Sequence, residues 1–167
     1  PPLNQLPIQV VAALSSALLY ALAQPPWNQA WLGYICLIPL LLVCQSSNLR
    51  CAASLGGLFA MLVAGFVTPW LPEMLGDYFS VNTLAAWPVA TLAWFGLAVP
   101  AFSAFAAFAS WIASSARSGR IRPLLIPLAT AGAFMLSELL RSHGLVRGPW
   151  GLLAYSQPAH SQLAQLA

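Results

Sequence analysis

The chain has 167 residues, of which 60% are hydrophobic and only 5% are charged, and its formal net charge is +3. A soluble globular domain has about a quarter charged residues, so this composition excludes a water-soluble fold. The positive balance comes from arginines, most of them in short polar stretches, which fits membrane orientation better than nucleic-acid binding.

Long charge-free intervals predict transmembrane helices. No Asp, Glu, Lys or Arg precedes Arg50, and none lies between Asp77 and Arg117. Each interval holds at least one run of the about 20 apolar residues that cross a bilayer. A backbone in lipid must satisfy its own hydrogen bonds, and the alternation typical of barrel strands is missing. We therefore expect an all-α polytopic membrane helix bundle of about five transmembrane helices, followed by a re-entrant or interfacial C-terminal segment. The expected spans are residues 8–23, 30–45, 51–70, 81–113 and 124–140.

Prolines and small residues mark these elements. The first span stops at Pro25-Pro26, which cannot continue a helix interior. The third span carries small residues that favour close helix contact, namely Gly56, Gly57, Ala60, Ala64 and Gly65. The stretch PEMLGDYFS that follows is expected to be a loop. The fourth run is longer than one crossing requires, so we expect it to tilt or to extend past the bilayer, with kinks at Pro88 and Pro100.

The arginines predict an orientation. Arg50 follows the second span, and Arg117, Arg120 and Arg122 follow the fourth, whereas the loops after the first and third spans have none. By the positive-inside rule the N-terminus and both arginine loops are cytoplasmic. The residues just beyond the fifth span then lie at the outer membrane–water boundary.

Charge gathers at that boundary, in the stretch SELLRSHGLVRGPWGLLAYSQ. Glu138 falls in the last turn of the fifth span, and Arg141, three residues on, shares its helix face. A lone carboxylate at that depth is costly, so we expect an ion pair with Ser142 nearby. One interpretation is a structural clamp that ends the helix. The alternative is a polar anchor for a lipid phosphate or for an adjoining domain.

A glycine-rich break follows, from Gly144 to Gly151, and suits a non-helical turn packed inside protein. Arg147 in this break either contacts a phospholipid headgroup or only extends its charge toward water. Trp150 and Tyr155 are the aromatic types expected at an interface. We expect neither metal ligation nor disulfides nor catalysis from the scattered histidines and cysteines, which are His143, His160, Cys36, Cys44 and Cys51.

Two stretches resemble a known family. Glu138-Leu139-Leu140-Arg141, then Pro149-Trp150, then Ala154-Tyr155-Ser156-Gln157 and SQLAQLA resemble the fifth-helix signature of bacterial apolipoprotein N-acyltransferases. That signature has Glu-x-x-Arg-Gly, a Gly-Phe-Pro-Trp turn and Gly-Tyr-Ser-Gln at the same offsets. The earlier AQPPWNQAWLGYICLIPLLL is similar to the family's first hairpin. Ser142 stands where the family usually has Gly, and Arg147-Gly148 replaces Gly-Phe, which indicates a divergent branch or a paralogue with altered lipid handling.

The resemblance implies an acyltransferase of the bacterial inner membrane that needs no cofactor. Such an enzyme transfers an acyl chain from a phospholipid to the N-terminal cysteine of a diacylated lipoprotein, through a thioester on an enzyme cysteine. In the family a nitrilase-like domain supplies a Glu-Lys-Cys triad. The present chain has no lysine, so we expect residues 1–167 to be the N-terminal transmembrane domain, inactive alone, with the catalytic half beyond Ala167 or absent.

The resemblance also implies the partners and the role of the charged stretch. The partners are the phospholipid donor, the lipoprotein, the nitrilase-like remainder of the polypeptide and the membrane, with no nucleic acid. The residues expected to support the fold or to face lipid, none of them catalytic or metal-binding, are Glu138, Arg141, Arg147, Trp150 and Tyr155.

Two other functions stay open at this point. A similar membrane region occurs with polyprenol-phosphate mannosyltransferases, where it anchors a glycosyltransferase. A small transporter or channel is the alternative of another class. Transport predicts ionisable residues at mid-bilayer, whereas Glu138 is the only acid within an expected span and lies near a helix end.

Overall fold

Helices make up the secondary structure of the chain in the computed structural model, which describes residues 6–143 and 152–157. Three helices are long and apolar enough to cross a membrane, namely α1, α3 and the Leu84–Arg117 part of α5. The predicted all-α membrane fold is therefore confirmed for the described residues. In chain order the elements are α1 (Leu6–Ala23), η2 (Ala30–Tyr34), α2 (Ile38–Ser46), α3 (Leu49–Val67), α4 (Leu71–Phe79), α5 (Thr83–Arg117), α6 (Leu125–His143) and η3 (Leu153–Ser156).

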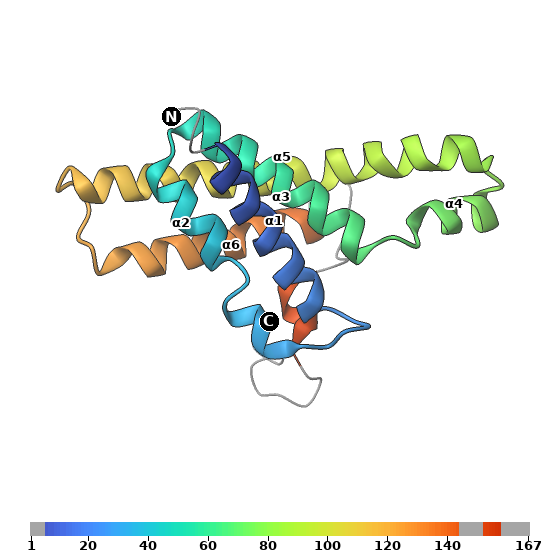
Figure 1. Ribbon diagram of the computed structural model, residues 1–167, viewed down its shortest axis with the longest axis horizontal. Helices are drawn as coiled ribbons and strands as arrows, with labels where there is room; N and C mark the ends of the chain where they lie inside the picture. Colours follow the sequence, from blue (N-terminus) through green and yellow to red (C-terminus); the bar gives the residue numbers. More distant parts are fainter. Residues whose placement is uncertain (1–5, 144–151, 158–167) are drawn as a thin grey trace.

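The bundle has two distinct ends (Figure 1). The first, which we call the Arg50 end, holds the start of α1, the turn between α2 and α3, and the last turns of α5. The opposite end, which we call the Glu138 end, holds the last turns of α1 and α6 together with η3. Hydrogen bonds join the elements of each end: Gln9 to Ser47 at the Arg50 end, and Gln24 to Leu152 at the Glu138 end.

A chain of aromatic rings runs through the core and links four helices. Tyr20 of α1 packs edge-to-face on Phe59 of α3, with ring centroids 5.8 Å apart. Phe59 packs in the same way on Phe102 of α5 at 5.2 Å, and Phe102 lies 6.2 Å from Phe134 of α6. Aromatic pairs of this kind add about 0.5–1.5 kcal/mol each beyond their burial, so the rings fix the relative positions of the helices.

Small residues let α3 and α5 approach closely, as the sequence predicts for part of α3. A Cβ added at Gly56 would collide with the backbone carbonyl of Phe102, and one at Gly57 would lie 3.1 Å from Ser103 Oγ. Gly65 has no neighbouring atom within 4 Å of such a Cβ. The close crossing is therefore confined to the first half of α3.

The second predicted span, residues 30–45, is divided between η2 and α2. Pro39 stands in the first turn of α2, where its missing N–H is tolerated but where it cannot continue a preceding helix. The next free donor of that turn, Leu40 N, bonds Ser16 Oγ of α1 at 2.8 Å. A serine side chain of α1 thus accepts a free N–H in the first turn of α2. That residues 30–45 cross the bilayer stays a prediction.

The stretch PEMLGDYFS differs from its prediction. The expected loop is wrong, because these residues form most of α4. Pro72 lies in the first turn, where proline is compatible with a helix start, and Ser80 with a φ of 52° ends the helix. The helix α5 includes Pro88 and Pro100 without interruption, and a kink at either proline stays a prediction.

Candidate functional site at the Glu138 end

The site begins with the last turns of α6, where Glu138 and Arg141 share one face. Glu138 Oε1 lies 3.7 Å from Arg141 Nη2, and the side chains are only 13% and 6% exposed, respectively. The guanidinium carbon of Arg141 also lies 4.9 Å from the ring centroid of Phe102. The predicted ion pair is therefore confirmed, with the guanidinium held between a carboxylate and an aromatic face of α5.

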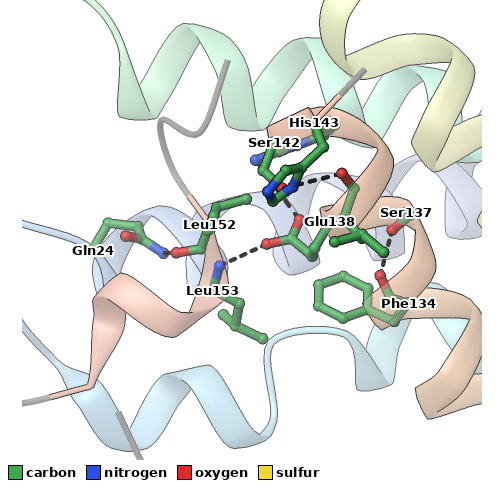
Figure 2. Close-up of polar contacts among 10 residues, drawn as sticks. Gln24, Phe134, Ser137, Glu138, Ser142, His143, Leu152 and Leu153 are labelled. Carbon is green, nitrogen blue, oxygen red and sulfur yellow. Dashed lines mark hydrogen bonds and ion pairs between the residues drawn. The ribbon is translucent and has the colours of Figure 1, made fainter. Parts of the chain in front are cut away.

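The two oxygens of Glu138 have different roles. The distance from Oε1 to Arg141 is too long for a hydrogen bond, and Oε1 has no hydrogen-bond partner among the described residues. Oε2 accepts the backbone N–H of Leu153 at 2.9 Å. The carboxylate therefore attracts the buried guanidinium by charge and, at the same time, binds a chain segment that follows α6 (Figure 2).

That segment, residues 152–157, which we call the docked segment, is bound from two further elements. Gln24, 2% exposed at the end of α1, donates from Nε2 to the carbonyl of Leu152 at 3.1 Å. Tyr34 Oη donates to Gln157 Oε1 at 3.0 Å. Figure 2 shows Gln24 and Glu138 reaching the docked segment from opposite sides. Contacts from α1, η2 and α6 thus hold one short piece of chain.

Gly33 permits the close approach of the docked segment to η2. A Cβ at this position would lie 2.8 Å from Ser156 Oγ and 3.7 Å from Leu153 Cδ1. Ser156 is buried, and its hydroxyl donates to the carbonyl of Leu153 at 2.7 Å within the single turn of η3. A larger side chain in place of Gly33 would have to displace this turn.

The other predicted site residues are placed only in part. Arg147 and Trp150 lie outside the described residues, as does the side chain of Tyr155, whose backbone belongs to η3. Ser142 was expected beside the ion pair, but it is partly exposed, donates to Leu139 O at 3.0 Å and lies 2.7 Å from His143 Nδ1. Its hydroxyl therefore belongs to the surface of α6 rather than to the pair.

Four residues that contact the docked segment or the ion pair were not predicted, namely Gln24, Gly33, Tyr34 and Phe102. Three of them lie in the stretch AQPPWNQAWLGYICLIPLLL, which the resemblance singled out without assigning a role to any residue. A glutamine at the end of an apolar helix is the signal that could have found Gln24, because a buried amide requires hydrogen-bond partners. Phe102 carries no such signal among the many aromatic residues of α5.

The three cysteines are either buried in the core or placed at the Arg50 end. All three are free thiols, and Cys36 and Cys44 are buried. Cys51 donates to Gln9 Oε1 at 3.4 Å, at the Arg50 end. Since the sequence has no lysine, a Glu-Lys-Cys triad does not occur within these 167 residues. Among residues 6–143 and 152–157, no three His, Cys, Asp or Glu side chains gather where a metal ion could bind.

Long apolar helices, together with a buried ion pair whose carboxylate anchors a chain segment, define a helical membrane domain with a polar site at its Glu138 end. The comparison with protein families identifies the kind of domain. The apolipoprotein N-acyltransferase N-terminal domain matches residues 16–167, and the chain belongs to this family. The match includes α6 and the docked segment, so the Glu138 end lies within the family domain. A comparison with the curated proteins gave no match.

Proposed function

We propose that this domain is the membrane platform on which a complete apolipoprotein N-acyltransferase moves an acyl chain from a phospholipid to the N-terminal cysteine of a diacylated lipoprotein. The family match supports the acyltransferase class. The observation that carries the structural role is the anchoring of the docked segment by Glu138. In this proposal a nitrilase-like domain of the same polypeptide supplies the Glu-Lys-Cys triad, whose lysine is a residue type that these 167 residues do not contain.

The burial of the ion pair supports the clamp interpretation over direct lipid binding. Glu138 and Arg141 are nearly enclosed by protein, so neither presents its charge to a headgroup in the described structure. The clamp instead fixes the end of α6 relative to the start of the docked segment. Residues 144–151 connect these two positions in the sequence. In this proposal Arg147, Trp150 and Tyr155 face the lipid, and Arg147 binds the phosphate of the acyl donor.

The proposed setting is the bacterial inner membrane, with the N-terminus and the Arg50 end in the cytoplasm. The distribution of arginines supports this orientation. The Glu138 end then lies at the outer boundary, where the diacylated lipoprotein arrives. Holding the donor there serves the reaction by fixing its acyl ester close to the catalytic domain.

The proposal is tested with the full-length protein, by following transfer of a labelled acyl chain from phospholipid vesicles to a diacylated lipopeptide. Arg147→Gln is expected to raise the KM for phospholipid about tenfold, as the loss of one charged contact predicts, with unchanged thermal stability. Arg120→Gln, which removes the same charge at the opposite end, is the matched control and should retain the parent KM. Absence of any acyl transfer by the parent protein, or an unchanged KM in Arg147→Gln, would contradict the proposal.

A further inference from the structure

The Arg50 end carries a polar pocket that the proposed function does not use. It has a volume of about 500 Å³ and lies between the α2–α3 turn and the side of α5. One arginine, one asparagine and three serines contribute to its lining. The lining residues are Ser47, Asn48, Leu49, Arg50, Ser110 and Ser114.

Buried hydrogen bonds fix the inner wall of this pocket. Ser110 Oγ donates to the carbonyl of Ser47 at 2.7 Å, and Gln9 Nε2 donates to Ser47 Oγ at 3.1 Å. Gln9, Ser47 and Ser110 are 3%, 7% and 2% exposed, respectively. These bonds tie α1, the α2–α3 turn and α5 together, so the pocket is formed before any ligand arrives.

The outer part of the pocket is positively charged. Arg50 is exposed and lines the pocket. Arg117 lies near the α2–α3 turn that forms one wall of the pocket, because its Nη1 donates to the carbonyl of Gln45, near the end of α2, at 2.7 Å. Asn48 caps α3 by accepting the N–H of Cys51 at 2.9 Å, so the positive end of the α3 dipole adds to the same field.

Negative charge is distant from this pocket. The three acids of the sequence are Glu73 and Asp77 of α4 and Glu138 in the last turns of α6. Figure 1 places α4 at the opposite end of the molecule from the α2–α3 turn. Within the part of the chain that the structure describes, the arginines at the Arg50 end therefore have no acidic side chain beside them.

Apolar surface borders the pocket on both sides. Leu49, at its edge, is 50% exposed, and Trp111, next to Ser110 on α5, is 46% exposed. In a membrane such side chains contact acyl chains. A ligand that fits this arrangement has an anionic headgroup for the pocket and hydrocarbon for the adjoining helix faces, and basic pockets between transmembrane helices bind lipid headgroups of this kind.

We propose that the pocket beside Arg50 binds the phosphate of an anionic phospholipid from the leaflet that borders the Arg50 end. Arg50 supplies the charge that faces the phosphate, and Arg117 adds to it. The hydroxyl groups of the lining bind the remaining oxygens. This site is separate from the acyl-donor position at the Glu138 end, so its occupancy does not depend on acyl transfer.

Lipid titration of the delipidated full-length protein, followed by native mass spectrometry, tests the proposal with phosphatidylglycerol and phosphatidylcholine as probes. The parent should bind phosphatidylglycerol more tightly than phosphatidylcholine. Arg50→Gln should weaken phosphatidylglycerol binding about fivefold, the effect expected of one arginine near an anionic lipid. The matched control is Arg120→Gln, which removes the same charge from the loop after α5 and should change the affinity less than twofold. Equal weakening in the two variants would show that only the general surface potential attracts the lipid and would overturn the proposal.

A second variant separates the pocket from its charge. Ser114→Leu places an apolar side chain in the lining without changing the net charge, and its exposed position on α5 tolerates the change. It should also lower phosphatidylglycerol affinity, whereas unchanged affinity would contradict binding in this pocket. Excess inorganic phosphate should leave the bound lipid in place. If it displaces phosphatidylglycerol completely, the pocket is a site for soluble phosphate and the lipid proposal is wrong.

Discussion

Removal of the carboxylate at position 138 should destabilise the domain because two contacts depend on the same group. Glu138→Ala removes the charged acceptor of the Leu153 N–H, a bond of a type worth about 1.5–3 kcal/mol, and takes the carboxylate away from a buried guanidinium. Breaking a buried ion pair costs about 3–5 kcal/mol. The 3.7 Å separation and the 13% exposure of Glu138 favour the lower limit. The two costs belong to one carboxylate and are not additive, so we expect the free energy of unfolding to fall by about 3 kcal/mol.

The assay is thermal unfolding of the purified protein in detergent. A loss of about 3 kcal/mol corresponds to a decrease in Tm of about 6–12 °C for a domain of this size. Glu138→Gln retains an oxygen that can accept the Leu153 N–H, so it should lose less than Glu138→Ala. Ser142→Ala, a change at a partly exposed position one helical turn away, is the control and should stay within about 0.5 kcal/mol of the parent.

A double-mutant cycle decides whether the pair itself is the cause. Arg141→Met removes the guanidinium and fills the same space with an apolar side chain. If the two side chains interact, the double variant Glu138→Leu/Arg141→Met should be more stable than the sum of its single variants predicts, by about 1–3 kcal/mol. Strict additivity, or a Glu138→Ala protein that melts like the parent, would refute the reasoning.

Three further substitutions test the packing with the same thermal assay. Gly56→Ala should lower the free energy of unfolding by about 1–3 kcal/mol, because its Cβ would meet backbone of α5. The control is Gly65→Ala, on the same helix with open space around it, which should be neutral or more stable by up to about 1 kcal/mol. Equal losses in the two variants would contradict the close crossing of α3 and α5. Gly33→Ala should cost about 1 kcal/mol by pushing the hydroxyl of Ser156, so adding Ser156→Ala should recover part of the loss, and no recovery would show that this contact is not limiting. Gln24→Leu should lower the free energy of unfolding by about 1–3 kcal/mol, because the Leu152 carbonyl of the docked segment loses its hydrogen-bond donor. A parent-like Tm would exclude a stabilising role for that bond.

Local spacing was enough to predict the long helices and the ion pair. Apolar length predicts the course of α1, α3 and α5 because a helix in lipid needs only a continuous hydrophobic run. Glu138 and Arg141 are three residues apart on one helix, so their proximity follows from the helical period alone. The amino-acid sequence and helix geometry are therefore sufficient to predict both the long helices and the ion pair.

Contacts between distant segments were beyond such reasoning. Gln24 and Leu152 are separated by 128 positions, and no periodicity relates them. The helix α4 was missed for another reason: proline, glycine and two acids in PEMLGDYFS are typical of a loop, while Pro72 in fact occupies the first turn, where a helix tolerates it. The break before α2 depends likewise on Ser16 of another helix, which supplies the acceptor for its first turn.

The bond between Gln24 and Leu152 has a consequence for biosynthesis. Ribosomes add about 5–20 residues per second, so the 128 positions between the two partners correspond to about 6–26 s of elongation. During that interval the Gln24 amide cannot bind its final acceptor, and solvation by water or lipid headgroups is the alternative. This solvation favours a position of the Gln24 end of α1 at the membrane surface until α6 and η3 have been synthesised.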